Sequence, residues 1–160
     1  MSTRANIILT ESYSWKDENN KQKSRTEKLY FYRHSDGYPE GTMPSLNIFI
    51  DWIKKGKIRD NLSQGAGWLI LIGAMEYNTI PEFKYEKTSY GRSYGDLDTI
   101  QMPNDWKCGA YEPATEIYGD IEYLYVIDVS NKSIKCFDSW NGETGEGIHE
   151  VDLKDNFKLV

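Results

Sequence analysis

The amino-acid sequence predicts the α+β fold class: a mostly antiparallel sheet of about five strands with two helices packed on one face. Two observations predict it. Short segments with alternating apolar side chains indicate strands, and two segments with apolar side chains at helical spacing indicate helices. The length of 160 residues fits a single domain that spans residues 1–160.

Two strands are expected in the N-terminal part of the chain. Residues 5–10 and 28–34 both alternate, and the second segment places Tyr30, Tyr32 and His34 on one face and Leu29, Phe31 and Arg33 on the other. The two strands would pair antiparallel. Residues 11–27 between them are polar and show no periodicity, so we expect an exposed connection there.

The first helix is predicted by one apolar stripe, made of Leu46, Phe49, Ile50 and Ile53. Thr42 is a possible cap, Pro44 suits the first turn, and Lys54 and Lys55 fall in the last turn. Gly56 supplies a left-handed stop. This helix would follow directly after the second strand and the turn at its end.

The second helix is expected from Asn61, with Gln64 in a capping arrangement, to about Tyr77. Its side chains facing the sheet would be Leu62, Leu69, Ile70 and Ala74. A glycine inside a helix costs about 1 kcal/mol relative to alanine. Either close packing at Gly65, Gly67 and Gly73, or a ligand at the segment 65–67, would compensate for this cost.

Residues 121–128 are expected to form a strand and 133–137 its hairpin partner, and 106–111 and 149–153 are candidates for further short strands. Residues 121–128 are apolar on both faces, which indicates a central strand. Residues 138–147 are expected to form a polar loop. Residues 78–105 form a long connection, which is either a surface loop or a lid bearing Tyr90, Arg92 and Tyr94.

Composition restricts the classes of function. The formal net charge is −6 and the pI is near 5.0, which argues against general nucleic-acid binding. The N-terminus resembles neither a signal peptide nor a membrane span, so we expect a soluble cytoplasmic protein without membrane contact. Cys108 and Cys136 lack metal-ligand spacing and are expected to be buried, reduced thiols. No metal and no cofactor is expected.

A candidate site follows the second strand. Asp36 and Gly37 break the strand, because aspartate bonds its own backbone and glycine accepts a positive φ. The break gathers polar side chains at the mouth of the sheet, where loops on a rigid frame often carry function: Arg33, His34, Asp36, Tyr38 and Glu40. The alternative is a simple turn flanked by surface charges.

The site suggests two kinds of chemistry. If strands 28–34 and 121–128 are antiparallel neighbours, His34 approaches Asp120 or Glu122, and a histidine beside a carboxylate can act as general base or acid. The catalytic candidates are therefore His34, Asp36 and Glu122. The candidates for binding an anionic, nucleotide-like ligand are Arg33, Arg59 or Arg92 for phosphate, Tyr38, Tyr118 or Tyr90 for stacking, and Glu40 and Asp120.

Four segments stand out when they are taken together: MSTRANI at the start, YRHSDGYPEG at 32–41, GAGWLI at 65–70 and YEPATEIYGDIEYLYVID at 111–128. They resemble a family of small, uncharacterised proteins of tailed bacteriophages and bacterial genomes. The resemblance covers most of the chain outside 11–27 and 78–105. It implies a phage or mobile-element setting and an accessory factor acting on host machinery, in the host cytoplasm if the protein is phage-encoded. It supplies no catalytic residues.

Two hypotheses of function follow. The first is a phage-associated accessory protein that acts as a non-catalytic binder, either an inhibitor of a host defence protein or a sponge for a nucleotide signal. The abundance of tyrosine, the acidity and the lack of a catalytic motif favour it. The second is a small hydrolase or transferase that acts on a nucleotide-like phosphate ligand through a His/carboxylate pair.

Overall fold

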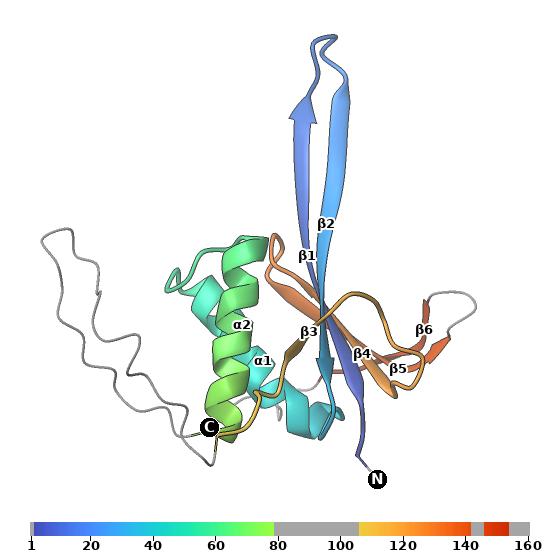
Figure 1. Cartoon of the computed structure of the whole chain (residues 1–160). Helices are drawn as coiled ribbons and strands as arrows, with labels where there is room; N and C mark the ends of the chain where they lie inside the picture. The colour runs from blue at the N-terminus through green and yellow to red at the C-terminus, as the bar shows by residue number, and fades with distance from the viewer. Residues whose placement is uncertain (1, 79–105, 142–145, 154–160) are drawn as a thin grey trace, which may run out of the picture.

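The computed structural model of the chain describes residues 2–78, 106–141 and 146–153 (Figure 1). In chain order the elements are β1 (Ala5–Lys16), β2 (Gln22–Arg33), α1 (Pro39–Lys54), α2 (Leu62–Tyr77), β3 (Glu112–Ala114), β4 (Tyr123–Asp128), β5 (Ser133–Asn141) and β6 (Glu146–Val151). None of the helices in this described part is long and apolar enough to cross a membrane.

The described strands form one six-stranded sheet in the order β3-β2-β1-β4-β5-β6. β1 pairs antiparallel with β2 and parallel with β4, so the sheet is mixed. The α+β class is confirmed, whereas a mostly antiparallel sheet of about five strands is wrong. After β2 the chain forms both helices and then β3, which lies on the outer edge of β2. It then crosses to the other side of β1, where β4 runs in the same direction as β1.

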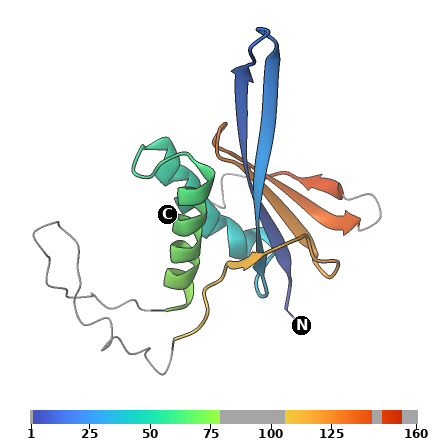
Figure 2. The ribbon, with the colours of Figure 1, turned by 45° about the horizontal axis from the view of Figure 1, so that its top comes forward.

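Both helices pack on one face of the sheet, as expected (Figure 2). The core on this face joins Ile7, Leu9 and Phe31 of the sheet to apolar side chains of the helices, among them Leu46, Phe49, Ile53, Leu69 and Ile72. The opposite face is covered by the connection between β3 and β4, where Ile8, Tyr32, Ile121 and Leu124 form a second, smaller cluster. Residues 5–9 of β1 and 31–33 of β2 therefore bury side chains on both faces of the sheet.

The first helix begins earlier than its sequence signals suggest. Its N-cap is Tyr38, so Thr42 and Pro44 lie inside α1, and the expectation that they open the helix is wrong. Pro39 occupies the first helical position, where its missing N–H costs nothing. The expected end is confirmed, because Lys54 lies in the last turn and Gly56 adopts a left-handed φ of 69°.

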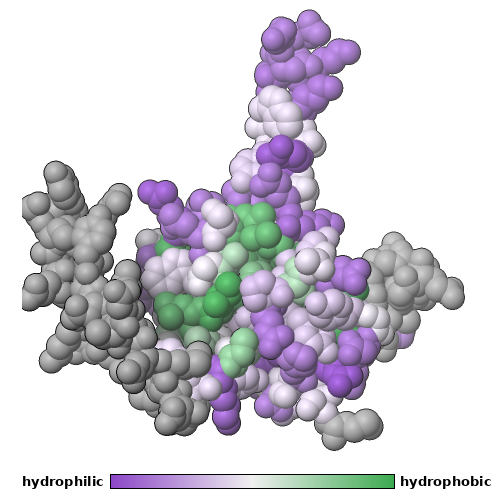
Figure 3. Space-filling view, in the orientation of Figure 1, coloured by the Kyte–Doolittle hydropathy of each residue, from purple (hydrophilic) through white to green (hydrophobic). Residues whose placement is uncertain are grey.

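The second helix confirms both of its expected ends. The side chain of Asn61 accepts a hydrogen bond from the N–H of Gln64, and the helix ends at Tyr77. A Cβ on Gly73 would lie 2.8 Å from the ring of Tyr111, so close packing requires this glycine. Ile70 was expected to face the sheet but is 40% exposed. Leu71 and Met75 of α2 are also exposed, and Figure 3 shows apolar surface on this side of the molecule.

Residues 11–27 are not the expected irregular connection. β1 and β2 run on as a long hairpin that projects from the body of the molecule, with partners from Ala5↔Arg33 to Lys16↔Gln22 (Figures 1 and 2). A tight loop closes it, in which Asp17 Oδ1 accepts hydrogen bonds from the N–H groups of Asn19 and Lys21, both at 2.9 Å. We call residues 13–25 the arm, because among the described residues they pair only with each other.

The second half of the chain is partly as expected. β4 lies between β1 and β5, which confirms its central position. Residues 106–111 do not form a strand, and the short strand is β3 instead. β5 and β6 extend into the segment 138–147 that was expected to be a loop. The lid hypothesis concerns residues 78–105, of which 79–105, including Tyr90, Arg92 and Tyr94, lie outside the described residues.

The two cysteines differ in environment. Cys136 is buried, as expected, and burial raises the pKa of its thiol to about 12. Cys108 is exposed, so the expectation that both thiols are buried is wrong. Cys108 lies in the irregular segment before β3, which packs only its neighbours Ala110 and Tyr111 into the core.

Candidate functional site

The turn after β2 is built by the polar residues that the sequence singled out. Asp36 adopts a left-handed φ of 55°, and its carbonyl accepts a hydrogen bond of 2.8 Å from the hydroxyl of Thr42. The carbonyl of Gly37 accepts one of 2.7 Å from the hydroxyl of Tyr125. A Cβ on Gly37 would lie 2.9 Å from Ala5, so the turn packs tightly on the start of β1. These contacts give the turn a structural role.

Arg33 is enclosed by the protein. Its side chain is 1% exposed and forms a two-pronged pair with Glu76, at 2.7 Å and 2.9 Å. It also donates to the carbonyls of Ser35 and Gly41 and lies over the ring of Tyr111. Burial alone would lower the pKa of Arg33, but the hydrogen bonds to Glu76, together with the electrostatic effects of Tyr111, Glu76 and Tyr77, raise that pKa. The guanidinium therefore stays charged and links β2 to α2, and each of its three nitrogens has a protein partner.

His34 does have a carboxylate partner, but neither of the two expected ones. Its Nε2 lies 3.0 Å from a carboxylate oxygen of Glu112 in β3. The expectation that β2 and β4 are neighbours is wrong, because β1 lies between them. Asp120 instead accepts hydrogen bonds from Tyr32 at 3.2 Å and from Arg4 at 3.0 Å.

Tyr32 connects these two pairs on the face opposite the helices. Its ring meets those of His34 and Tyr118 edge to face, with centroids 4.4 Å and 4.8 Å apart. Burial, with a further contribution from Asp120, raises the pKa of Tyr32. Tyr118 is held in place because its N–H donates to the buried side chain of Asn6. These contacts join six side chains into one cluster at one end of the sheet: Arg4, Tyr32, His34, Glu112, Tyr118 and Asp120.

The other expected site residues lie in the turn after β2, in α1, directly before β4 and before α2. Tyr38 donates from its hydroxyl to Asp36 at 3.1 Å, and Glu40 is exposed in the first turn of α1. Glu122 is exposed at the start of the central strand, where its N–H donates to the carbonyl of Arg4. Arg59 lies before α2, whereas Arg33 contacts its last turn. A helix of sixteen residues is roughly 24 Å long, so Arg59 is remote from His34.

Sequence reasoning missed Glu112, Tyr32 and Arg4. The alternation of β2 already placed Tyr32 and His34 on one face, which was the available signal. Glu112 could not be found this way, because 78 positions separate it from His34. Its position became apparent only with the pairing of β3 to β2.

The chemistry open to the His34–Glu112 pair is limited by its exposure. The side chain of His34 is 60% exposed and that of Glu112 is 36% exposed, so water screens their interaction. Such a pair can exchange protons with solvent, but it is not enclosed as catalytic groups usually are. Within the described ranges, no three His, Cys, Asp or Glu side chains are grouped so that they could hold a metal ion.

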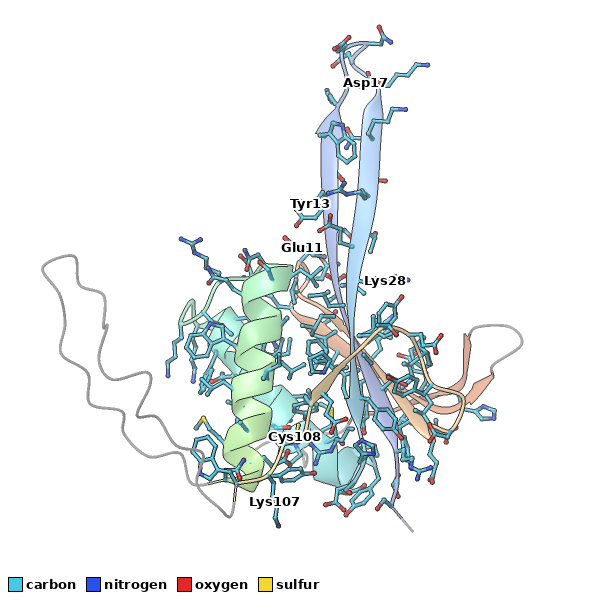
Figure 4. All side chains as sticks on the ribbon, in the orientation of Figure 1. Glu11, Tyr13, Asp17, Lys28, Lys107 and Cys108 are labelled. Carbon is cyan, nitrogen blue, oxygen red and sulfur yellow. The ribbon has the colours of Figure 1, made fainter. Side chains whose placement is uncertain are left out.

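The arm presents a second surface. Its two faces differ, because side chains alternate along each strand. One face carries Tyr13 opposite Arg25 and Trp15 opposite Lys23. Tyr13, which is labelled in Figure 4, is 39% exposed and Trp15 is 47% exposed. The guanidinium of Arg25 lies over the Tyr13 ring. The other face carries small hydroxyl side chains, such as Ser14 opposite Ser24.

Comparisons of the chain with protein-family models, with curated proteins and with solved structures give no match. The resemblance to phage proteins therefore stays a prediction.

Proposed function

We propose that the chain is a non-catalytic binding protein that engages a host protein through the aromatic face of its arm, as an accessory factor of a bacteriophage. One observation carries the proposal: Tyr13 and Trp15 are exposed on a two-stranded hairpin that extends beyond the body. Tyrosine and tryptophan are the residues most enriched at the energetic centres of protein interfaces. An isolated hairpin is also only marginally stable in water, so a partner would stabilise the arm.

Of the two kinds of binder, we favour an inhibitor of a host defence protein over a protein that sequesters a nucleotide signal. A sponge needs cationic or amide groups free to hold phosphate. The three nitrogens of Arg33, one of the candidates, donate hydrogen bonds to Glu76 and to backbone carbonyls. Arg59 lies at the other end of α2. The resemblance to phage proteins supports a bacterial host as the source of the partner.

Affinity capture from lysate of the bacterial host tests the proposal. The tagged chain is compared with the double variant Tyr13→Thr/Trp15→Thr, in which threonine keeps β-propensity but removes the aromatic surface. The matched control is Ser14→Thr/Ser24→Thr, which changes the opposite face of the arm at the same height. We expect one host protein to be captured by the wild type and the control and to be lost from the double variant. Equal capture by all three chains would refute a role for the aromatic face.

A second candidate function is the small hydrolase or transferase, which the contact of 3.0 Å between His34 and Glu112 favours. Incubation with a panel of nucleotide signals should then yield altered products. His34→Ala should abolish turnover without lowering the melting temperature, because the side chain is largely exposed. Glu122→Gln serves as the control that leaves the pair intact. Ligand released unchanged after heating would point instead to a sponge.

A further inference from the structure

β2 has a free edge. Its inner edge pairs with β1 along the whole strand, but on the outer edge β3 covers only Tyr30, Phe31 and Tyr32. Residues 22–29 therefore have no strand beside them on that side within the described part of the chain. Such a row of backbone groups is a template for an added strand.

The direction of the backbone groups on this edge follows from one hydrogen bond of β1. The N–H of Ser12 donates to the hydroxyl of Ser130 at 3.2 Å, on the side away from β2. In an antiparallel pair, residues directly opposite each other both point inward or both point outward. Thr26 lies opposite Ser12, so its N–H and C=O point outward, and the same alternation applies to Ser24 and Lys28.

The short strand β3 agrees with this alternation. Pro113, which has no N–H to donate, lies opposite Phe31, an inward-pointing position of β2. Tyr30 and Tyr32 are therefore the residues whose backbone groups are directed to β3. A partner strand would continue the row that β3 begins and would bond to Lys28, Thr26 and Ser24 in turn.

The charges beside this edge select the partner. Residues 22–29 carry Lys23, Arg25 and Lys28 against a single acid, Glu27, which pairs with Arg25 at 2.6 Å, so Lys23 and Lys28 give this edge its excess positive charge in a chain whose formal net charge is −6. Positive side chains on an edge disfavour pairing of two copies of the same edge. They favour a strand that carries carboxylates, because oppositely charged side chains on neighbouring strands attract.

We infer that the free edge of β2 accepts an extended, acidic segment of a partner protein as an added strand. The inference rests on the proposed function and adds the mode of binding and the chemistry of the partner. Backbone hydrogen bonds would supply the general affinity, and the basic side chains would supply the preference for acidic sequence.

Amide hydrogen exchange of the full chain, resolved by residue, tests the inference with two blocked peptides at millimolar concentration. One is acetyl-(Glu-Val)4-amide and the other is acetyl-(Lys-Val)4-amide. We expect the acidic peptide to slow exchange at Ser24, Thr26 and Lys28 by about tenfold or more, with little effect from the basic peptide. The charge-reversed variant Lys23→Glu/Lys28→Glu should lose the protection and keep the exchange pattern of the free hairpin.

Three results would overturn the inference: no slowing with the acidic peptide, equal slowing with both peptides, or slowing that rises with protein concentration without any peptide. The last would assign the edge to a second copy of the chain. Failure here is separable from failure of the proposed function. If the charge-reversed variant still captures the host protein and Tyr13→Thr/Trp15→Thr does not, the arm binds its partner without strand addition.

Discussion

A carboxylate oxygen of Glu11 accepts a hydrogen bond from the backbone N–H of Leu62 at 2.7 Å. Glu11 lies at the base of the arm and is 8% exposed, and Leu62 is the first residue of α2. The N–H groups of a first helical turn have no partner within the helix, and a negative charge there is favourable. This bond therefore joins the arm to the body and helps to fix its direction.

Replacing Glu11 should destabilise the chain. Glu11→Ala removes a buried acceptor from the start of α2, and we expect a loss of about 1–2 kcal/mol in the free energy of unfolding. Urea unfolding followed by circular dichroism measures this loss. Glu27→Ala, directly opposite on β2 but more exposed, is the control and should cost less. Equal stability of Glu11→Ala and the wild type would mean that the bond to Leu62 contributes nothing.

The Arg33–Glu76 pair should matter for stability rather than for binding. Glu76→Gln leaves a buried guanidinium with a weaker partner, and we expect a loss of about 2–3 kcal/mol in the free energy of unfolding. The loss is smaller than for a fully buried pair, because the side chain of Glu76 is 27% exposed. Asp51→Asn breaks the exposed pair with Lys55 on α1 and should cost less than about 0.5 kcal/mol. Thermal and urea unfolding compare the two variants. Similar losses would contradict the structural role of Arg33.

The buried hydroxyl of Tyr111 should make the folded chain less stable at high pH. Burial raises the pKa of its hydroxyl from 10.0 to about 12 in the folded chain. Between these values the unfolded chain releases the proton and the folded chain keeps it, so stability falls as the pH rises from 10 to 12 and is unaffected below 10. In Tyr111→Phe this decline should be shallower by about 1.4 kcal/mol per pH unit. Unfolding in urea across this pH range gives both slopes, and identical slopes would contradict the assignment.

Amide exchange of the free chain should alternate along β2. In the antiparallel pairing, Lys23, Arg25 and Glu27 direct their N–H groups to β1, whereas Ser24 and Thr26 direct theirs to solvent. We expect the first set to exchange about tenfold more slowly or more. Uniformly fast exchange over residues 22–29 would show that the hairpin does not persist in solution.

Local patterns in the sequence predicted the elements that have one buried face. The alternation in 28–34 placed Phe31 and Arg33 on one face and Tyr32 on the other, and in the structure Phe31 and Arg33 face the helices and Tyr32 faces away from them. The apolar stripe of α1 and the cap of α2 were equally visible. In each case the burial of one side imposes a period on the sequence.

The arm could not be predicted in the same way. Both of its faces are exposed, so no apolar period distinguishes β1 beyond Thr10 from a polar loop. Cross-strand contacts such as Tyr13 with Arg25, and the bonds of Asp17 in the closing loop, define the hairpin instead. The parallel pairing of β1 with β4, and the partner of His34, depend on contacts between distant parts of the chain that a local pattern does not encode.

The affinity of the captured host protein for the arm is the most direct test of the proposed function. Titration calorimetry of the purified partner against the wild type and Trp15→Thr measures it. A buried tryptophan at the centre of an interface predicts that Kd rises by about thirtyfold or more, because such residues contribute about 2 kcal/mol or more. An unchanged Kd for Trp15→Thr and for Tyr13→Thr would contradict the account.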